Sequence, residues 1–235
     1  MKKILYILAG LFVIQFAGNP LYAAVGDLIN IQLGNGRTYT NGAAINDVSG
    51  QYWNKFTYTE DDNADLFYSN NTLSTAKLTY AVDESVSISS SNIVMNSTDR
   101  NLFSGYLIID QNSSEFILQG LDAGTYDLYV YSQVASNNSS SLQFTANGVS
   151  GSLTNNGTLT SLVEGANYLK TSVVVSDAGT LAISIAGNSQ INGIQLLQTS
   201  TAPEPASMVL LGVGGVLAAA AKLRRKPGDV SDAVS

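Results

Sequence analysis

The sequence contains no cysteine and no histidine, and these two absences exclude several kinds of chemistry. Without cysteine the chain has no disulfides, so its stability must come from core burial or from bound ions. Without histidine there is no Ser-His-Asp triad, no histidine-ligated metal site and no imidazole base. Carboxylate, tyrosine, lysine and metal-assisted chemistry remain as the only routes for an enzyme.

Positive charge is also scarce in the central part of the chain. Residues 24–205 contain five cations and sixteen acids, which gives a net charge of −11. The whole chain has a net charge of only −7, because six of its eleven cations lie near the two ends. An acidic surface of this kind repels phosphate backbones, so the sequence argues against nucleic-acid binding.

The N-terminal segment has the order of a secretory signal peptide. Lys2 and Lys3 precede an apolar run over residues 4–16, and Pro20 then precedes the small residues Ala23 and Ala24. We expect signal peptidase to cleave after Ala23 or Ala24. An uncleaved anchor is the alternative, but the apolar run is shorter than the ~20 residues that a bilayer span needs.

The C-terminal segment has a second apolar run followed by positive charge. Residues 208–221 contain no charged residue, and residues 222–226 contain four cations. This order predicts a short transmembrane span whose basic end stays in the cytoplasm. A core helix is a poor alternative because it would end in an unpaired cluster of cations, and a single-pass tail anchor is the other alternative.

Three features of this end together resemble the PEP-CTERM sorting signal of Gram-negative bacteria that make extracellular polysaccharide. They are a Pro-Glu-Pro motif with a following serine, a short apolar span and a basic cluster, carried by Pro203, Glu204, Pro205, Ser207, Arg224, Arg225 and Lys226. The resemblance implies that a membrane-embedded exosortase cuts near the motif. The protein would then pass transiently through the inner membrane and end at the cell surface or in the extracellular matrix.

These signals divide the chain into four parts. We expect a signal peptide at 1–23, an extracellular domain at 24–201, the sorting signal at 203–226 and a cytoplasmic tail at 227–235. The domain has about 180 residues, enough for one substantial hydrophobic core.

Alternation of apolar and polar residues dominates the expected domain, and no long amphipathic helix interrupts it. The strongest pattern covers residues 125–131, where Tyr126, Leu128 and Val130 share one face. Short strands separated by turn residues predict an all-β sandwich or jelly roll. The expected strands are 28–33, 52–58, 76–82, 85–88, 106–110, 116–118, 125–131, 142–146, 168–175, 180–185 and 191–197, with an exposed loop at 136–141.

The order of three segments also resembles galactose-binding-like jelly rolls. The segments are the early strand 29–33, the Gly-Gln-Tyr-Trp-Asn motif at 50–54, and the pair formed by 118–126 and 191–196. This resemblance implies a β-sandwich, a fold often used to bind carbohydrate. It does not imply that this copy binds a sugar.

Trp53 is the only tryptophan and the first candidate for a sugar contact. Together with Tyr52 it offers an aromatic face on which a pyranose ring could stack. A tryptophan flanked by Tyr52, Phe56 and Tyr58 is also typical of a hydrophobic core or its edge. We favour the core interpretation and keep the sugar platform as the alternative.

The densest group of carboxylates lies at residues 60–65. Asp61, Asp62 and Asp65 are hard oxygen donors at close spacing, the kind that Ca²⁺ prefers. The segment lacks the spacing of a helix-loop-helix calcium loop, and a solvated polar turn is the simpler interpretation. No cofactor other than this structural calcium is predicted.

The sequence contains no recognisable catalytic motif. A glycosidase needs two acids placed across the scissile bond, and nothing selects one pair among sixteen. We therefore expect a non-catalytic exported surface or matrix protein associated with extracellular polysaccharide. A carbohydrate-binding module that recognises a polysaccharide is the alternative, and an acid-based glycoside hydrolase or lyase is a second one.

Overall fold

The computed structural model describes residues 26–201, except residues 47, 90–91, 111, 136–137, 156 and 177. Within this range the regular structure is β-strand, apart from the short 3₁₀ helix η2 (Leu102–Ser104). No helix in the described part is long and apolar enough to cross a membrane. The predicted signal peptide and sorting signal lie outside the described residues.

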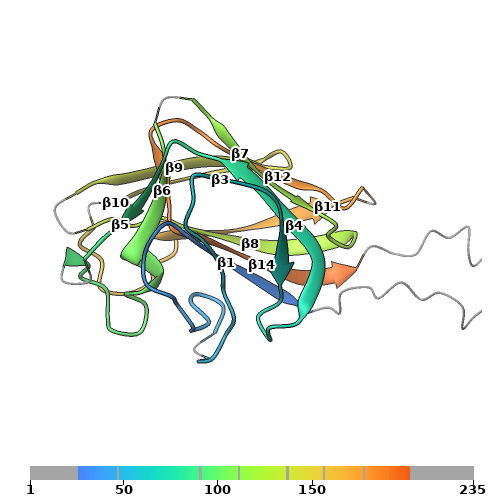
Figure 1. The fold of residues 1–235 in the computed structure, drawn as a ribbon, viewed down its shortest axis with the longest axis horizontal. Helices are drawn as coiled ribbons and strands as arrows, with labels where there is room; N and C mark the ends of the chain where they lie inside the picture. The colour runs from blue at the N-terminus through green and yellow to red at the C-terminus, as the bar shows by residue number, and fades with distance from the viewer. Residues whose placement is uncertain are drawn as a thin grey trace, which may run out of the picture. The chain divides into compact units, whose positions relative to one another are not determined.

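The strands form two large sheets and one small one (Figure 1). One large sheet has five strands in the order β11-β8-β14-β1-β2, and the other has six in the order β10-β9-β12-β7-β4-β3. A three-stranded sheet has the order β13-β6-β5. The bounds are β1 (Leu28–Leu33), β2 (Asn54–Phe56), β3 (Glu60–Phe67), β4 (Leu73–Ala81), β5 (Glu84–Ser87), β6 (Gly105–Ile109), β7 (Ser114–Gln119), β8 (Gly124–Tyr131), β9 (Ser140–Ala146), β10 (Val149–Asn155), β11 (Tyr168–Val175), β12 (Leu181–Ile185), β13 (Ser189–Ile191) and β14 (Gly193–Thr201).

The main hydrophobic core lies between the two large sheets. The five-stranded sheet contributes alternate residues of β1, β8 and β14, including Ile31, Leu128 and Ile194. The six-stranded sheet contributes residues such as Phe116 and Ile183, which are fully buried. Strands with one face in a shared core are the defining feature of a sandwich, so the predicted all-β jelly-roll architecture is confirmed.

A second hydrophobic cluster covers the opposite face of the five-stranded sheet. Tyr129 and Tyr131 alternate with the core residues of β8 and therefore point away from the main core. They pack with Tyr39, Trp53 and Phe103 from the long connections before β2 and before β6. Strand β1 and the adjoining parts of β8 and β14 are consequently buried on both faces, whereas the outer face of β11 is exposed, with Val174 67% exposed.

Most predicted strands are present with small shifts of their ends. Strands β1 and β11 match the expected ranges 28–33 and 168–175, and β8 begins one residue earlier than expected. The expected single strand at 191–197 is instead two strands, β13 and β14, which belong to different sheets. Asn192 lies between them, and its side-chain amide donates to the carbonyl oxygen of Gly105 (2.8 Å).

Two strands were not predicted, and both have polar outer faces. Residues 60–65 form most of β3 and are not a polar turn, because β3 pairs with β4 along its length. Residues 149–155 form β10, in which only Val149 and Leu153 give an apolar signal. The expected loop at 136–141 also ends early, since β9 begins at residue 140.

Candidate functional site

The outer face of the five-stranded sheet is closed by a buried polar network. Asn30, Gln32 and Gln195 point out from β1 and β14, and each is fully buried. The Gln195 amide donates to Asn30 Oδ1 (2.8 Å) and to the carbonyl oxygen of Gly42 (3.1 Å). The sequence indicated polar residues on this strand face, and the covering loops explain why they are buried rather than solvated.

Two tyrosines complete this network. The Tyr131 hydroxyl donates to Gln195 Oε1 and accepts from the backbone N–H of Ala44 (3.2 Å). The Tyr39 hydroxyl donates to Asp99 Oδ1 (2.7 Å). Burial is the largest cause that raises the pKa of both phenols well above the usual value of 10.0, so both hydroxyls stay protonated and hold the loops in place.

Trp53 belongs to this closed face. Its side chain is 4% exposed, its ring meets the Tyr39 ring edge-to-face at 5.0 Å, and its indole N–H donates to the carbonyl oxygen of Asn41 (2.8 Å). A stacking platform needs an open ring face, so the structure supports the core interpretation and does not support the sugar platform. Tyr52 is 36% exposed and packs against Phe67, with ring centroids 5.5 Å apart.

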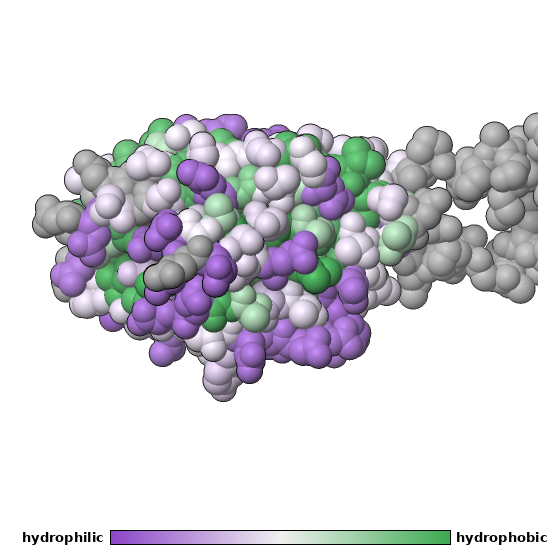
Figure 2. Space-filling view, turned by 90° about the horizontal axis from the view of Figure 1, so that it is seen from above, coloured by the Kyte–Doolittle hydropathy of each residue, from purple (hydrophilic) through white to green (hydrophobic). Residues whose placement is uncertain are grey.

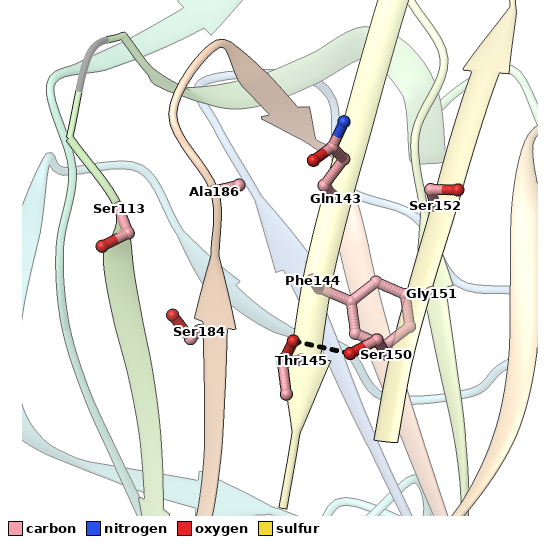
Figure 3. Close-up of a pocket in the computed structure, with 9 residues that line it drawn as sticks. All are labelled: Ser113, Gln143, Phe144, Thr145, Ser150, Gly151, Ser152, Ser184 and Ala186. Atoms are coloured by element: carbon pink, nitrogen blue, oxygen red, sulfur yellow. Dashed lines mark hydrogen bonds between the residues drawn. The ribbon is translucent and has the colours of Figure 1, made fainter. Parts of the chain in front are cut away.

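The outer face of the six-stranded sheet, in contrast, is open to solvent (Figure 2). A hollow of about 570 Å³ lies over β9, β10 and β12. Its polar side chains come from β9, β10 and β12 and from the residue before β7, as Figure 3 shows, and they are Ser113, Gln143, Thr145, Ser150, Ser152 and Ser184. Thr145 and Ser150 share a hydroxyl–hydroxyl hydrogen bond of 2.9 Å.

Strand register explains why these hydroxyls meet. Ser150 pairs with Thr145, Thr145 pairs with Ser184, and Ser184 pairs with Glu115. Residues paired across antiparallel strands have neighbouring side chains on the same face. The result is a row of three hydroxyls and one carboxylate that crosses β10, β9, β12 and β7.

A second hollow of about 710 Å³ lies beside the first, since Ser113 lines both. It is lined by the carboxylates of Glu60, Asp61, Asp62 and Glu115, and no lysine or arginine is among the residues described there. Tyr80 also lines it and donates its hydroxyl to the carbonyl oxygen of Tyr58 (3.0 Å). Tyr58 is 73% exposed, the most exposed aromatic side chain in the described chain. We call the two hollows together the hydroxyl groove.

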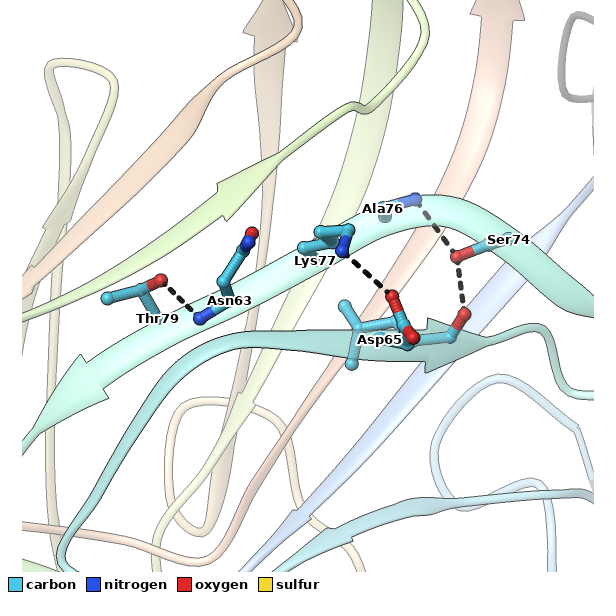
Figure 4. A network of polar contacts seen from close by, with 7 residues as sticks. Asn63, Asp65, Ser74, Ala76, Lys77 and Thr79 are labelled. Carbon is cyan, nitrogen blue, oxygen red and sulfur yellow. Dashed lines mark hydrogen bonds and ion pairs between the residues drawn. The ribbon is translucent and has the colours of Figure 1, made fainter.

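The aspartates predicted to bind calcium are not brought together. Asp65 pairs with Lys77 (3.1 Å), while Asp62 accepts from the Thr79 hydroxyl (3.3 Å). Figure 4 shows this edge of the sheet, where Asn63 takes a positive φ of 63° and its N–H donates to Thr79. Among the residues that the structure describes, no group of three or more acidic, histidine or cysteine side chains is placed to hold a metal.

Few features of the sequence indicate the hydroxyl groove. Its polar side chains come from strands that are far apart in the chain, and serine and threonine occur throughout the domain. The alternation of Val149, Gly151 and Leu153 with three polar residues was the available signal for β10.

The C-terminal region has a clear match among known protein families. Residues 201–226 match the PEP-CTERM protein-sorting motif. The match includes Pro203, Glu204, Pro205, Ser207, Arg224, Arg225 and Lys226, so the predicted sorting signal is confirmed. The chain is therefore an exported protein that is processed by an exosortase at the cell surface.

Several solved structures are similar to part of this chain. A family 35 carbohydrate-binding module from Clostridium thermocellum is 14% identical, with a TM-score of 0.30 and coverage of 53% of this chain and 88% of that one. A CBM35 from Cellvibrio japonicus is 11% identical, with a TM-score of 0.28 and coverage of 43% and 79%. A calcium-binding mutant of Bacteroides uniformis β-glucuronidase 2 is 14% identical, with a TM-score of 0.40, and the match spans 73% of this chain but 18% of the enzyme. No curated protein matches the sequence.

Proposed function

We propose that the folded domain is a non-catalytic module that associates with extracellular polysaccharide through the hydroxyl groove. The observation that carries this proposal is the contrast between the two large sheets. Loops and aromatic rings cover the central strands of the five-stranded sheet, whereas the six-stranded sheet presents an open polar hollow. An exported protein that keeps one broad polar face open has a surface on which a hydrated polymer can lie.

The chemistry of the groove fits sugar hydroxyls. Serine and threonine hydroxyls donate and accept, and the Gln143 amide does both at separate atoms. Such groups can exchange hydrogen bonds with a polymer whose surface is itself made of hydroxyls. The acidic end of the groove and the net charge of −11 over residues 24–205 favour a neutral or amino-bearing polysaccharide over an anionic one.

Several features support a non-catalytic role. The sequence has no histidine or cysteine to act as base or nucleophile. Glu60, Asp62 and Glu115 are exposed in the groove. A carboxyl that acts as a general acid at neutral pH is usually kept protonated by burial.

A glycan-specific binding module is the second candidate, and Tyr58 favours it. Its ring is exposed and lies two residues before Glu60, which lines the groove, and an exposed aromatic ring can stack on a sugar ring. A specific module would depend on Tyr58 and select a defined oligosaccharide. A general matrix protein would bind many polysaccharides, and its binding would depend on the serine and threonine hydroxyls of the groove alone.

Binding of the purified domain to host polysaccharide and to a glycan array tests both candidates. Changing Gln143, Thr145 and Ser152 to alanine should weaken binding about tenfold or more, because each lost hydrogen bond is worth about 1 kcal/mol. A control with Ser172→Ala and Ser200→Ala, on the five-stranded sheet, should bind like the parent. If the Tyr58→Ala variant loses binding and the parent domain selects one glycan, the domain is a glycan-specific module. Absence of binding to every polysaccharide would refute the proposal.

A further inference from the structure

The sequence contains five asparagine–glycine pairs, which are chemically weak points of a polypeptide backbone. The main-chain nitrogen of the residue after an asparagine can attack the side-chain amide carbon, and a glycine leaves that nitrogen unshielded because it has no Cβ. Four of the asparagines lie in the described part of the chain, namely Asn35, Asn41, Asn147 and Asn192, and Asn156 lies outside it. The folded structure decides which of the four can react.

Three of the four described asparagines are held by hydrogen bonds of their side-chain amides. Asn41 donates to a main-chain carbonyl oxygen (2.9 Å). Asn147 donates to another one (2.9 Å) and accepts from a main-chain N–H (3.3 Å). Asn192 is fully buried and also does both (2.8 Å and 2.6 Å). Each of these amides must break its hydrogen bonds before it can turn toward the next main-chain nitrogen, which slows the attack.

Asn35 has no such restraint. It lies in the bend directly after β1, it is exposed, and its side chain has no hydrogen-bond partner among the described residues. The N–H of Gly36 also has no hydrogen-bond partner there. The Lys55 ammonium donates to the carbonyl oxygen of Gly36, so a positive charge adjoins the reacting peptide. A nearby positive charge favours loss of the proton from the Gly36 nitrogen.

We propose that Asn35 is the described asparagine that deamidates in the folded domain, and that this reaction limits how long the fold stays intact. The Gly36 nitrogen loses its proton and bonds to Asn35 Cγ. The bond from Cγ to the side-chain nitrogen breaks, and that nitrogen takes up the proton and leaves as ammonia. Water then opens the resulting succinimide ring at Cγ to give aspartate, or at the main-chain carbonyl carbon to give isoaspartate, whose main chain runs through Cγ.

The isoaspartate product does not fit the fold, because it lengthens the main chain by one carbon in a segment that is fixed on both sides. The N–H of Gly34 donates to a main-chain carbonyl oxygen (2.9 Å), and the N–H of Arg37 donates to the Ser104 hydroxyl (2.5 Å). The segment has no space in which to shift, since a Cβ on Gly36 would lie 2.3 Å from the main-chain nitrogen of Gly105.

The same segment anchors the polar network over the five-stranded sheet. The Gln32 side chain donates to the carbonyl oxygen of Arg37 (2.5 Å) and accepts from the N–H of Tyr39 (2.9 Å). A displaced Arg37 would therefore weaken the cover of this sheet. The aspartate product keeps the length of the main chain, and Arg37 and Lys55 supply positive charge close to its new carboxylate.

The test uses purified protein spanning residues 24–201, which contains the whole described core. The protein is incubated at mildly alkaline pH, and peptide mapping by mass spectrometry follows the conversion of each asparagine. We expect Asn35 to convert about tenfold or more faster than Asn147, because the hydrogen bonds that hold Asn147 add to the barrier. In urea, where no fold holds the amides, Asn41, Asn147 and Asn192 should react at rates close to that of Asn35.

The two products and matched variants test the effect on the fold. The fraction that carries isoaspartate, identified by labelling with an isoaspartyl methyltransferase, should have a Tm lower by roughly 5 °C or more. Asn35→Asp should melt within about 2 °C of the parent. Asn35→Gln should stop the fast reaction, because glutamine must close a larger ring. Asn147→Gln is the matched control and should leave the fast reaction unchanged.

The proposal is wrong if Asn35 stays intact in the folded domain while it reacts in urea. It is also wrong if Asn41, Asn147 or Asn192 converts as fast as Asn35 in the folded domain. If the isoaspartate form melts at the same temperature as the parent, the reaction does not limit how long the fold stays intact. None of these measurements involves a polysaccharide, so this proposal and the proposed function can fail separately.

Discussion

Gln195 shows how one side chain can hold several segments of backbone. It links β14 to Asn30 on β1, to the carbonyl oxygen of Gly42 and to the hydroxyl of Tyr131. Every polar atom of this amide is used, which is what makes a buried polar network stabilising. Gln198, three residues later on the same strand, has the opposite situation, since both of its polar atoms lack a partner.

We predict that Gln195→Leu is strongly destabilising. The change leaves the Asn30 side chain, the Gly42 carbonyl and the Tyr131 hydroxyl without their partner, and each buried group left unsatisfied costs about 1–3 kcal/mol. Urea unfolding should show a loss of roughly 3 kcal/mol or more. Gln143→Leu is the matched control on exposed β9, and it should change stability by no more than about 0.5 kcal/mol. If Gln195→Leu and Gln143→Leu lower the free energy of unfolding equally, the buried network does not stabilise the fold.

Strand β3 illustrates how an exposed sheet edge is protected. It is the last strand of the six-stranded sheet, and its register with β4 shifts between Asp61 and Ala64 and again between Asp65 and Phe67. Bulges and charged side chains both hinder pairing with the edge strand of another molecule. The acidic segment is thus explained without any bound ion.

We expect the removal of this charge to promote self-association. Replacing Asp61, Asp62 and Asp65 with serine should give concentration-dependent dimers or larger species, measured by light scattering at physiological salt. A control that removes the same charge away from sheet edges, at Asp110, Glu115 and Glu164, should stay monodisperse to the same degree as the parent. Association of both variants would show that net charge, rather than the β3 edge, keeps the molecules apart.

The sequence predicts some elements well because their signals are local. Strand β8 has strict alternation, and Gly120, which adopts a positive φ of 74°, marks the turn before it. Strand β3 was missed because acidic residues are poor strand formers, and its pairing with β4 overrides that tendency. The hydroxyl groove was not predictable, since it depends on which distant strands become neighbours.

Tyrosine burial governs how the whole domain should respond to pH. Seven phenols have a pKa raised above 10.0, with burial as the largest cause in each case, and they are those of Tyr39, Tyr68, Tyr80, Tyr106, Tyr126, Tyr131 and Tyr168. The folded state therefore keeps its phenol protons at a pH where the unfolded chain loses them. This stabilising effect is complete below pH 10.0 and is lost as the pH rises through the folded pKa values.

We predict that the free energy of unfolding is nearly constant near neutral pH and falls steeply at alkaline pH. No histidine titrates between about pH 6 and 8, so the free energy of unfolding should change little there. Above pH 10 it should fall, with the Tyr68 phenol titrating at about 12 while the fold persists. Urea unfolding across pH, with phenolate absorbance recorded in parallel, measures both effects. If the free energy of unfolding begins to fall below pH 9, the buried tyrosines are not the cause of the alkaline loss of stability.

The position of β14 has a mechanical consequence. This strand leads directly to the sorting motif, and it lies between β8 and β1 with antiparallel pairing on both sides. Tension applied through the C-terminal end would act along the strand, across hydrogen bonds that lie perpendicular to it. Those bonds would be sheared together instead of opening one after another. A polymer bound to the six-stranded sheet would therefore pull against a central strand that is paired on both sides.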